Sequence, residues 1–520
     1  MIYVLLGQTA SGKTSLALKL ARKLSLPILS ADAYQCYRKM QIGTDKPKKE
    51  EVEGLAYLFY DCHDPDEEVN VSLFQKTYRP IVEEMVDEGK DLIVVGGTFL
   101  YIKALLFDYR FPVEKEEKSV YESLSFQEQV AELKRIAPQV AEQIDIHNPR
   151  RVLRALLQIA NGEDRQEIHS KLSDKPLFPS LFFEIEVDKE EGNRLIDERI
   201  DRMFEEGFVE EVENLLQEYP SDLRSFQSLG YRELIQALEE KRGLADCKKL
   251  IKIHTHQYAK KQRTFLRHQF KDIHKGKREE IEQLISDHVL LRQRTDILLS
   301  KNKKDLEGKS ILLCGIGGVG GIVAEGLARL GAMDVTLIDK DKVESTNLNR
   351  QILYTKEDLG KNKVDCAKRR LLSINPLMKV DAICQAIQTE EDLPEKRFDV
   401  ILDVIDDTNG KALLYQKAQK DHSLYLTSAG FGFHFDSTKV TYGILKDVHD
   451  PLTKNFKKRL GELGIADTDN IPVVYPKDAR RRGKSGEKTI GSLFEEVNAG
   501  GLAILTWLLK RWEERNDDGK

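Results

Sequence analysis

The chain has 520 residues, of which 40% are hydrophobic and 32% are charged, and its formal net charge is −6 at pH 7. This length predicts two or more domains, and the composition excludes wholesale disorder. No apolar run approaches the roughly 18 residues needed to span a bilayer, and MIYVLLG leads directly into a motif with no room for a signal peptide, so we expect a cytoplasmic protein. The six cysteines include no C-x-x-C pair, which argues against a zinc ribbon or a disulfide framework. The negative net charge does not indicate nucleic-acid binding, although an average hides local basic faces.

Two segments share one design, an apolar β-branched run followed by a glycine turn and a helical pattern. They are IYVLLG at 2–7 and SILLCG at 310–315, and each is predicted to be the first strand of a parallel α/β sheet. Residues 271–309 between them are rich in charged residues, as expected of a hinge or an exposed helix. We therefore predict one domain over 1–290, in which about 112–220 form a mainly helical lobe, and a second domain over 291–520.

The first motif fits G-x-x-x-x-G-K-[ST] between a predicted strand and the helical segment SLALKLARKL. In this motif, glycines let backbone N–H groups surround phosphate oxygens at a helix N-terminus, Lys13 adds a cation, and the Thr14 hydroxyl is a ligand for Mg²⁺. The predicted residues of this phosphate or diphosphate cradle are Gly7, Thr9, Ala10, Ser11, Gly12, Lys13 and Thr14. The motif alone does not choose among a kinase, an NTPase and a transferase.

Three further stretches follow in order: SADAYQ at 30–35, IGTDKP at 42–47 and GGTFLY at 96–101. Because the carboxyl ends of parallel strands converge on the phosphate site, we expect Asp32 and Thr98 to face the cradle. In isolation, Asp32 could equally cap a helix and Thr98 could close a turn.

These stretches resemble the tRNA dimethylallyltransferase family when taken together with the P-loop. The similarity extends over about residues 1–288 and includes four later segments: NPRRVLRAL at 148–156, RIDRMFEEG at 199–207, LGYREL at 229–234 and HQYAKKQRTFLR at 256–267. That family transfers a dimethylallyl group from its diphosphate to N6 of the adenosine 3′ to the anticodon. The resemblance implies a P-loop that holds a leaving diphosphate, with dimethylallyl diphosphate as co-substrate. The chain departs from the family pattern at Gln8, Ala33 and Phe99.

The resemblance also implies roles for individual residues. Asp32 is placed as the general base, Thr98 as the group that orients the base or a diphosphate oxygen, and the P-loop with Mg²⁺ as the support of the leaving group. The residues expected to contact the tRNA anticodon stem-loop are Asp32, Ala33, Tyr34, Gln35, Thr98, Arg150, Arg151, Val152, Leu153 and Arg154. On the segment 256–267, His256, Lys260, Arg263 and Arg267 recur at helical spacing, so one stripe either contacts the RNA backbone or is a solvated charged face. We expect Ile251, Tyr258 and Phe265 to be core residues.

The second motif is a dinucleotide-type fingerprint at Gly315, Gly317, Gly318 and Gly320, with Asp339 at the end of the next predicted strand. It predicts a Rossmann-like α/β domain, but NAD, FAD and ATP enzymes all use this fingerprint.

The residues that follow are similar to the ubiquitin-activating (ThiF/MoeB/HesA-like) adenylyltransferases, which use ATP to activate a carboxylate. This resemblance implies that Asp339 binds the ribose, Arg350 and Lys363 the phosphates, Asn347 the nucleotide pocket, and Asp406 Mg²⁺, with Arg350 as a catalytic residue. Asp341 and Asn349 complete the expected ATP site. In the superfamily an arginine before the first strand reaches the partner's ATP, so Arg294 implies a homodimer.

Within that superfamily, RTDILL at 294–299 and the segment 450–464 resemble tRNA threonylcarbamoyladenosine dehydratase over about residues 292–512. That family adenylates the threonyl carboxylate and cyclises the modification with loss of AMP. One alternative is a P-loop kinase fused to an activator of a ubiquitin-like or sulfur-carrier protein, and another makes the second half an ATP-bound dimerisation scaffold. Because both modifications occupy N6 of the same type of adenosine, we expect each domain to serve a different set of tRNAs.

Overall fold

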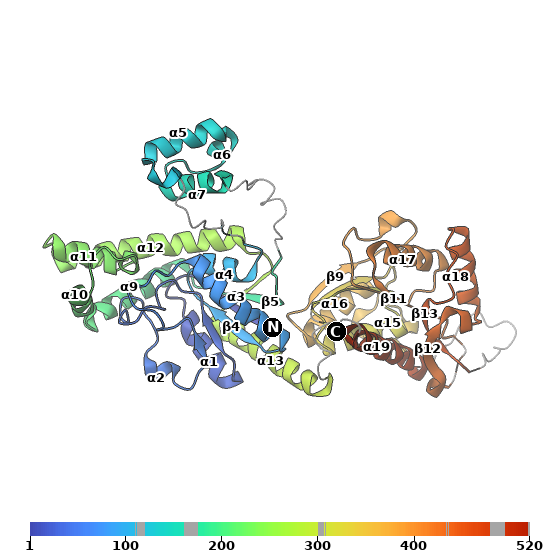
Figure 1. Cartoon of the computed structure of the whole chain (residues 1–520). Helices are drawn as coiled ribbons and strands as arrows, with labels where there is room; N and C mark the ends of the chain where they lie inside the picture. The colour runs from blue at the N-terminus through green and yellow to red at the C-terminus, as the bar shows by residue number, and fades with distance from the viewer. Residues whose placement is uncertain are drawn as a thin grey trace. The chain divides into compact units, whose positions relative to one another are not determined.

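The computed structural model describes residues 1–109, 111, 120–160, 175–299, 306, 308–432, 434, 436–478 and 494–517. The chain forms two compact units, Met1–Gln283 and Leu284–Lys520. Each unit has its own sheet (Figure 1). Each unit also has its own hydrophobic core. The predicted fold class, two α/β domains with parallel sheets, is confirmed. In the described part of the chain, no helix is both long enough and apolar enough to cross a membrane.

The sheet of the first unit has six strands in the order β3-β2-β4-β1-β5-β6, and all its ladders are parallel. The central strand β1 is buried along its whole length, as expected for a parallel strand covered on both faces. The strands are β1 (Ile2–Leu6), β2 (Ile28–Ser30), β3 (Tyr57–Leu58), β4 (Leu92–Val95), β5 (Ser180–Ile185) and β6 (Ile273–Gly276).

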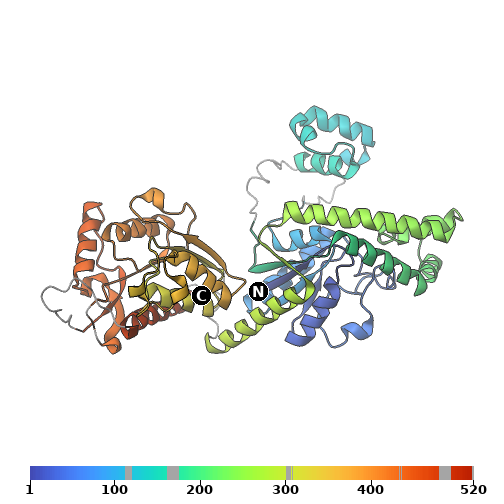
Figure 2. The same cartoon turned by 180° about the vertical axis from the view of Figure 1, so that it is seen from behind.

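Helices of the first unit cover this sheet and carry most of the later family segments. The long helix α12 lies beside α9, and the pair is visible from the front in Figure 1 and from behind in Figure 2. The helices are α1 (Lys13–Leu24), α2 (Lys49–Val52), α3 (Val71–Asp87), α4 (Phe99–Leu106), α9 (Lys189–Glu205), α10 (Phe208–Glu218), α11 (Tyr231–Glu239), α12 (Leu244–Gln269) and α13 (Arg278–Leu299), the last of which contains the boundary between the units.

A helical lobe lies between α4 and β5 in the chain. It consists of α5 (Phe126–Ile136), α6 (Pro138–Gln143) and α7 (Pro149–Ala160), which share a separate small core. The predicted lobe over 112–220 was too long, because 180–185 form the strand β5 inside the sheet and 189–218 form α9 and α10. The run LFFEI places Phe182, Phe183 and Ile185 in the core, so tertiary burial rather than helical periodicity determines this segment.

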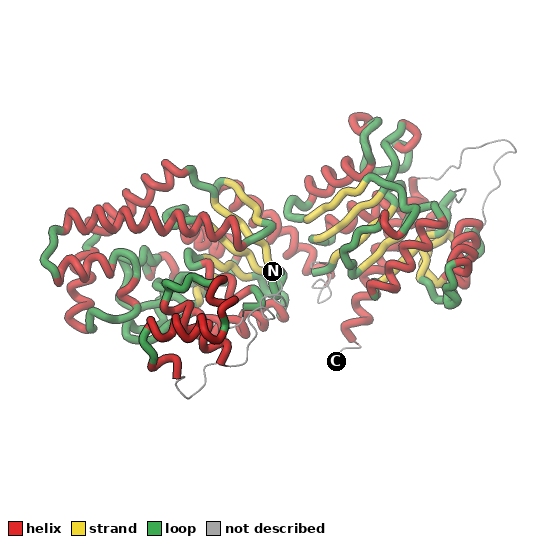
Figure 3. The backbone as a smooth tube through the Cα atoms, turned by 90° about the horizontal axis from the view of Figure 1, so that it is seen from above, coloured by secondary structure: helices red, strands yellow, loops and turns green. Residues whose placement is uncertain are grey.

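The second unit has a seven-stranded sheet in the order β12-β13-β11-β10-β7-β8-β9, parallel except for β12, which pairs antiparallel with β13. Figure 3 shows its strands between helices. The strands are β7 (Ser310–Cys314), β8 (Asp334–Ile338), β9 (Lys379–Ile383), β10 (Val400–Asp403), β11 (Leu424–Ser428), β12 (Val440–Ile444) and β13 (Pro472–Pro476). The helices are α15 (Gly318–Arg329), α16 (Lys363–Ile374), α17 (Thr408–Asp421), α18 (Pro451–Glu462) and α19 (Phe494–Asp517).

Candidate active sites

The P-loop connects the end of β1 to the start of α1. Its backbone takes positive φ at Gly7 (147°), Ala10 (61°) and Gly12 (80°), so the chain turns sharply before the helix begins. Gly12 is the N-cap of α1 and has no side chain with which to cap it. The first amides of α1 are therefore available to an anion, which the helix dipole also favours.

The Lys13 side chain lies buried inside this loop. Its Nζ donates to the Gln8 carbonyl oxygen at 2.6 Å and lies 3.5 Å from Ser11 Oγ. Burial, with the Arg199 charge as a second cause, lowers the pKa of Lys13 to about 7. Near neutral pH the Lys13 amine is therefore only partly protonated in the free site, and a bound anion would favour its protonated form.

Asp32 and Thr98 lie just beyond β2 and β4, whose carboxyl ends adjoin the P-loop. Asp32 Oδ1 accepts hydrogen bonds from the backbone N–H of Tyr34 (3.0 Å) and Gln35 (3.4 Å), and Thr98 Oγ1 accepts one from Ala33 N–H (3.2 Å). One carboxylate oxygen of Asp32 thus holds the turn, while Oδ2 has no hydrogen bond within the described residues.

A cavity of about 580 Å³ opens over the P-loop. A second chamber of about 210 Å³ has Ile200, Met203 and Phe208 among its walls. Five residues line both spaces, namely Thr9, Asp32, Thr44, Arg199 and Tyr258. Asp32 therefore lies where the cavity over the P-loop meets a more apolar one.

Several residues of this site had no role predicted from the sequence. Gln262 of α12 accepts from Thr9 N–H through Oε1 (2.7 Å) and donates to the Gly97 carbonyl through Nε2 (2.9 Å). Arg199 of α9 donates from Nη1 to Thr9 Oγ1 (3.0 Å), and its Nε lies 3.3 Å from Asp45 Oδ2. Each lies in a segment that carries the family resemblance, but neither has a local pattern that indicates its partner.

The predicted basic stripe of α12 is divided among different partners. His256 pairs with Asp197 at 2.9 Å and Arg263 binds Gln8, while Lys260 and Arg267 are exposed. Tyr258, expected in the core, instead lines both cavities and donates to the Gly97 carbonyl at 3.1 Å.

The predicted tRNA contacts of α7 have unequal access to solvent. The Val152 side chain is fully buried in the core of the lobe, so this side chain supports the lobe, and the predicted tRNA contact at this position remains a prediction. Arg151 is exposed and Leu153 is half-buried, whereas the side chains of Arg150 and Arg154 lie outside the described residues.

Two departures from the family pattern serve packing. Phe99 is 4% exposed and lies with its ring centroid 6.0 Å from that of Phe265 and 6.3 Å from that of Phe270. It lines neither cavity. Gln8 is buried beside Arg263, so both substitutions are accommodated behind the site rather than in it.

The glycine loop of the second unit connects β7 to α15. Gly315 has φ of 91°, and a Cβ there would lie 2.6 Å from the Val404 carbonyl oxygen. A Cβ at Gly320 would lie 1.8 Å from the Gly315 oxygen, whereas one at Gly317 would meet nothing closer than 3.9 Å. Two glycines therefore allow tight packing, and Gly317 leaves room for a ligand to approach the backbone.

The predicted nucleotide-binding residues follow the ends of β7, β8 and β10. Asp339 accepts from Ile316 N–H at 2.6 Å, and burial raises the pKa of its carboxyl group. Lys363 Nζ lies 2.9 Å from Asp341 Oδ2, and Arg350 donates to the Thr346 carbonyl at 2.9 Å.

The remaining predicted members of this site differ in exposure. Asn347 caps a turn by accepting from Glu344 N–H at 3.0 Å. Asn349 accepts from Arg350, and Asp406 is exposed just after β10. The Arg294 side chain lies outside the described residues.

Behind these residues lies a buried polar network that the sequence did not indicate. Lys411 Nζ lies 3.1 Å from Asp403 Oδ1 and donates to Thr427 Oγ1 at 2.8 Å, and both charged side chains are at most 1% exposed. Tyr425 donates to Asp403 Oδ2 at 2.6 Å. In addition, Tyr354 donates to the Ile316 carbonyl at 2.7 Å and so supports the glycine loop.

Comparison with known proteins agrees with both halves of this description. The IPP transferase family model matches residues 35–269, and the ThiF family model matches residues 290–472. A tRNA dimethylallyltransferase from Exiguobacterium sibiricum is 36% identical over 280 residues, which are 52% of this chain and 87% of that protein. One from Bacillus pumilus is 35% identical over 274 residues, 51% of this chain and 86% of that protein.

Two solved structures are each similar to a part of the chain. A eukaryotic dimethylallyltransferase acting on tRNA has 23% identity and a TM-score of 0.50, covering 57% of this chain and 79% of that one. The E. coli tRNA N6-threonylcarbamoyladenosine dehydratase has 26% identity and a TM-score of 0.41, covering 44% of this chain and 95% of that one. On the strength of the curated relatives, the chain belongs to the tRNA dimethylallyltransferase family through its first unit and carries a ThiF-family domain in its second.

Proposed function

We propose that the first unit transfers the dimethylallyl group of dimethylallyl diphosphate to N6 of the adenosine 3′ to the anticodon of tRNA. The observation that carries this proposal is the position of Asp32 between the P-loop cavity and the apolar chamber. N6 forms a bond to the allylic carbon as the bond from that carbon to the diphosphate oxygen breaks. Asp32 Oδ2 accepts the proton that the amine loses, and Thr98 keeps the Asp32 turn in place through Ala33.

The diphosphate leaves into the larger cavity. There the first amides of α1, the Lys13 ammonium and the Arg199 guanidinium offset its charge. The smaller chamber, with its apolar walls, receives the flipped adenosine.

Mg²⁺ fits the donor set at the same cavity. The Thr14 hydroxyl lines the cavity, and among the described residues no group of three His, Cys, Asp or Glu side chains forms a protein-only metal site. Thr14, diphosphate oxygens and waters would therefore hold the ion, as Mg²⁺ commonly requires. When bound, it supplies charge neutralisation to the leaving group.

The product that leaves the P-loop distinguishes this reaction from a kinase. With unmodified tRNA, Mg²⁺ and dimethylallyl diphosphate, the protein is expected to release inorganic diphosphate, and ATP alone is expected to yield no ADP. Release of ADP with no diphosphate from the prenyl donor would favour the P-loop kinase.

We further propose that the second unit uses ATP to adenylate a carboxylate, namely that of threonylcarbamoyladenosine in tRNA. The ThiF-family match and the open face at Gly317, close to Asp339 and Lys363, support ATP as the ligand. A carboxylate oxygen bonds to the α-phosphorus and diphosphate leaves. The carbamoyl group then attacks the acyl carbon, and AMP leaves as the ring closes. Asp406 would hold Mg²⁺, and Arg350 would bind the phosphates.

Formation of AMP from α-labelled ATP tests this second reaction. It should require tRNA that carries threonylcarbamoyladenosine and should be lost in Arg350→Ala and Lys363→Ala, but not in Lys361→Ala, which replaces a nearby exposed lysine. AMP formation that needs a carrier protein instead would favour the activator reading. A stable dimer that forms no AMP with either substrate would favour the scaffold reading.

We also propose a cytoplasmic homodimer whose two activities modify different tRNAs. Both groups occupy N6, so one adenosine cannot carry both. Light scattering of the purified protein tests the dimer, and detection of both groups on one adenosine would refute the division of substrates.

A further inference from the structure

The loop 41–47 forms one wall of the cavity over the P-loop, and a helix distant in the sequence holds it in place. Glu211 of α10 accepts hydrogen bonds from three successive backbone N–H groups of this loop. Oε2 accepts from Gln41 (2.9 Å) and Ile42 (2.7 Å), and Oε1 accepts from Gly43 (3.2 Å). The Tyr231 hydroxyl also donates to Oε1, at 2.5 Å. One carboxylate therefore accepts four hydrogen bonds. Hydrogen bonds to a carboxylate are charge-assisted and stronger than those between neutral groups.

Packing fixes the loop against the same helices. A Cβ at Gly43 would lie 2.1 Å from a ring carbon of Phe208 and 2.4 Å from one of Tyr231. The two rings meet edge to face with centroids 5.0 Å apart. The loop therefore has no room to move toward α10 or α11 while Glu211 holds its amides.

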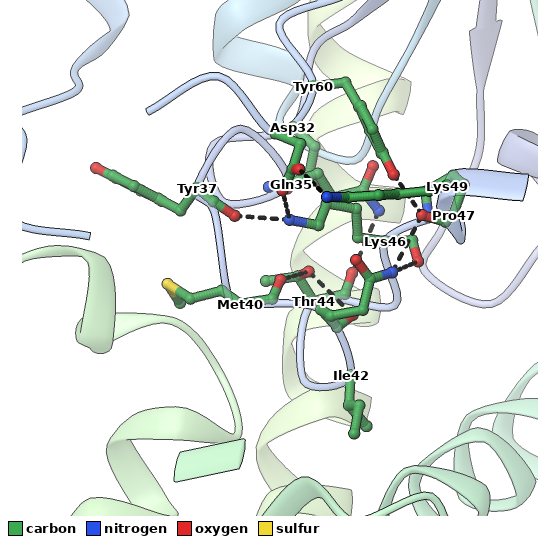
Figure 4. A network of polar contacts seen from close by, with 12 residues as sticks. Asp32, Gln35, Tyr37, Met40, Ile42, Thr44, Lys46, Pro47, Lys49 and Tyr60 are labelled. Carbon is green, nitrogen blue, oxygen red and sulfur yellow. Dashed lines mark hydrogen bonds and ion pairs between the residues drawn. The ribbon is translucent and has the colours of Figure 1, made fainter. Parts of the chain in front are cut away.

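The rest of the loop is held by residues of the segment that follows Asp32 (Figure 4). Gln35 Nε2 donates to the carbonyls of Thr44 and Asp45, each at 3.2 Å, and Thr44 Oγ1 donates to the Met40 carbonyl at 2.7 Å. Lys46 Nζ donates to the Tyr37 carbonyl at 2.7 Å. These contacts hold the second part of the loop, whereas Glu211 holds the first part.

Asp45 connects the loop to the P-loop through Arg199. It has a positive φ of 49°, and its carboxylate lies 3.3 Å from Arg199 Nε and 3.4 Å from Arg202 Nη2. Arg199 in turn donates to Thr9. A continuous series of contacts therefore leads from Glu211 to the loop, from Asp45 of the loop to Arg199, and from Arg199 to Thr9.

We propose that Glu211 is a positioning residue for the diphosphate end of the site. It lines neither cavity, so it acts through Asp45 and Arg199 and does not touch the substrate. This role rests on the proposed function, in which that cavity binds the diphosphate of the prenyl donor. Asp32 is held by its own turn, so the chemical step depends little on Glu211.

Calorimetry of inorganic diphosphate with the full-length protein tests the proposal. Glu211→Gln should weaken diphosphate binding about tenfold, because the amide can no longer accept at one of its two positions and the loop amides there lose their partner. The KM for dimethylallyl diphosphate should rise by a similar factor, while kcat and the KM for tRNA change less than about threefold. Glu210→Gln, at an exposed position of the same helix, is the matched control and should match the parent.

A double-mutant cycle with Asp45→Asn separates positioning from general stability. If Glu211 acts through Asp45, Glu211→Gln adds little in the Asp45→Asn background; independent action would give additive losses and overturn the proposal. Diphosphate affinity within twofold of the parent would overturn it as well.

If Glu211→Gln loses its circular dichroism spectrum, Tyr231→Phe replaces it, and weaker diphosphate binding with kcat retained is again expected; unchanged binding overturns the proposal. A parent protein that binds no diphosphate would refute the proposed function itself. If the parent binds diphosphate and Glu211→Gln binds it equally well, only this inference is refuted.

Discussion

Gln262 joins the P-loop to the loop after β4, and Gln262→Leu removes that connection with little change in size. The side chain is 4% exposed and bridges Thr9 N–H and the Gly97 carbonyl. Thr9 N–H would lose its acceptor inside the site, at a cost of about 1–3 kcal/mol. The Gly97 carbonyl still accepts a hydrogen bond from the Tyr258 hydroxyl, so losing the bond from Gln262 costs only about 0.5–1.5 kcal/mol at this carbonyl. Buried leucine offsets about 1 kcal/mol, which leaves a net destabilisation of about 2 kcal/mol.

The two units can be followed separately, because both tryptophans, Trp507 and Trp512, belong to the second unit. Differential scanning calorimetry should show the transition of the first unit about 3–4 °C lower in Gln262→Leu, because a unit of this length has an unfolding entropy of about 0.6 kcal/mol/K. The transition reported by tryptophan fluorescence should not move. Gln257→Leu, at an exposed position of α12, is the control and should change stability by no more than about 0.5 kcal/mol. A first-unit transition that stays with the control would refute the bridging role of Gln262.

Two further predictions concern charge. Because burial lowers the pKa of Lys13 to about 7, the free site loses this cation as pH rises through about 7, whereas a bound anion holds the proton; the affinity for inorganic diphosphate should therefore fall between pH 7 and 9. In Lys13→Met the affinity should be lower and flat over that range by calorimetry, and a parallel decline in both proteins would contradict the assignment. In the second unit, Lys411→Met leaves the buried Asp403 without its cation, so tryptophan-monitored unfolding in urea should show a loss of about 3–5 kcal/mol. A loss below about 1 kcal/mol would mean that the hydroxyl donors alone stabilise the Asp403 carboxylate.

Local patterns were sufficient for the features that a strand, a turn and a helix define together. The glycine turns at 7–14 and 315–320, and the positions of Asp32 and Asp339 after their strands, depend on sequence neighbours and on the rule that parallel strands end at one edge. These features determine the fold class, which the structure confirms. The functional roles of these residues remain predictions.

Features that depend on distant segments could not be predicted. Gln262 meets Thr9, and Glu211 meets Gly43, across 253 and 168 residues respectively. Tyr258 has the heptad spacing of a core residue, yet it faces both cavities because α12 runs past the end of β4. Strand β5 was assigned to a helical lobe, since a short apolar run has no periodicity that distinguishes a central strand from a helix.

The central claim is that Asp32 is the base of a tRNA prenyl transfer, and nucleoside mass spectrometry tests it most directly. Unmodified tRNA is incubated with Mg²⁺, dimethylallyl diphosphate and either the parent protein or Asp32→Asn, which keeps an oxygen for the amides of Tyr34 and Gln35. The parent should yield N6-prenylated adenosine, and Asp32→Asn should yield it about 10²–10⁴ times more slowly at a similar KM for the prenyl donor. Prenylation by Asp32→Asn at the parent rate, or no prenylated adenosine from the parent with any tRNA, would contradict the account.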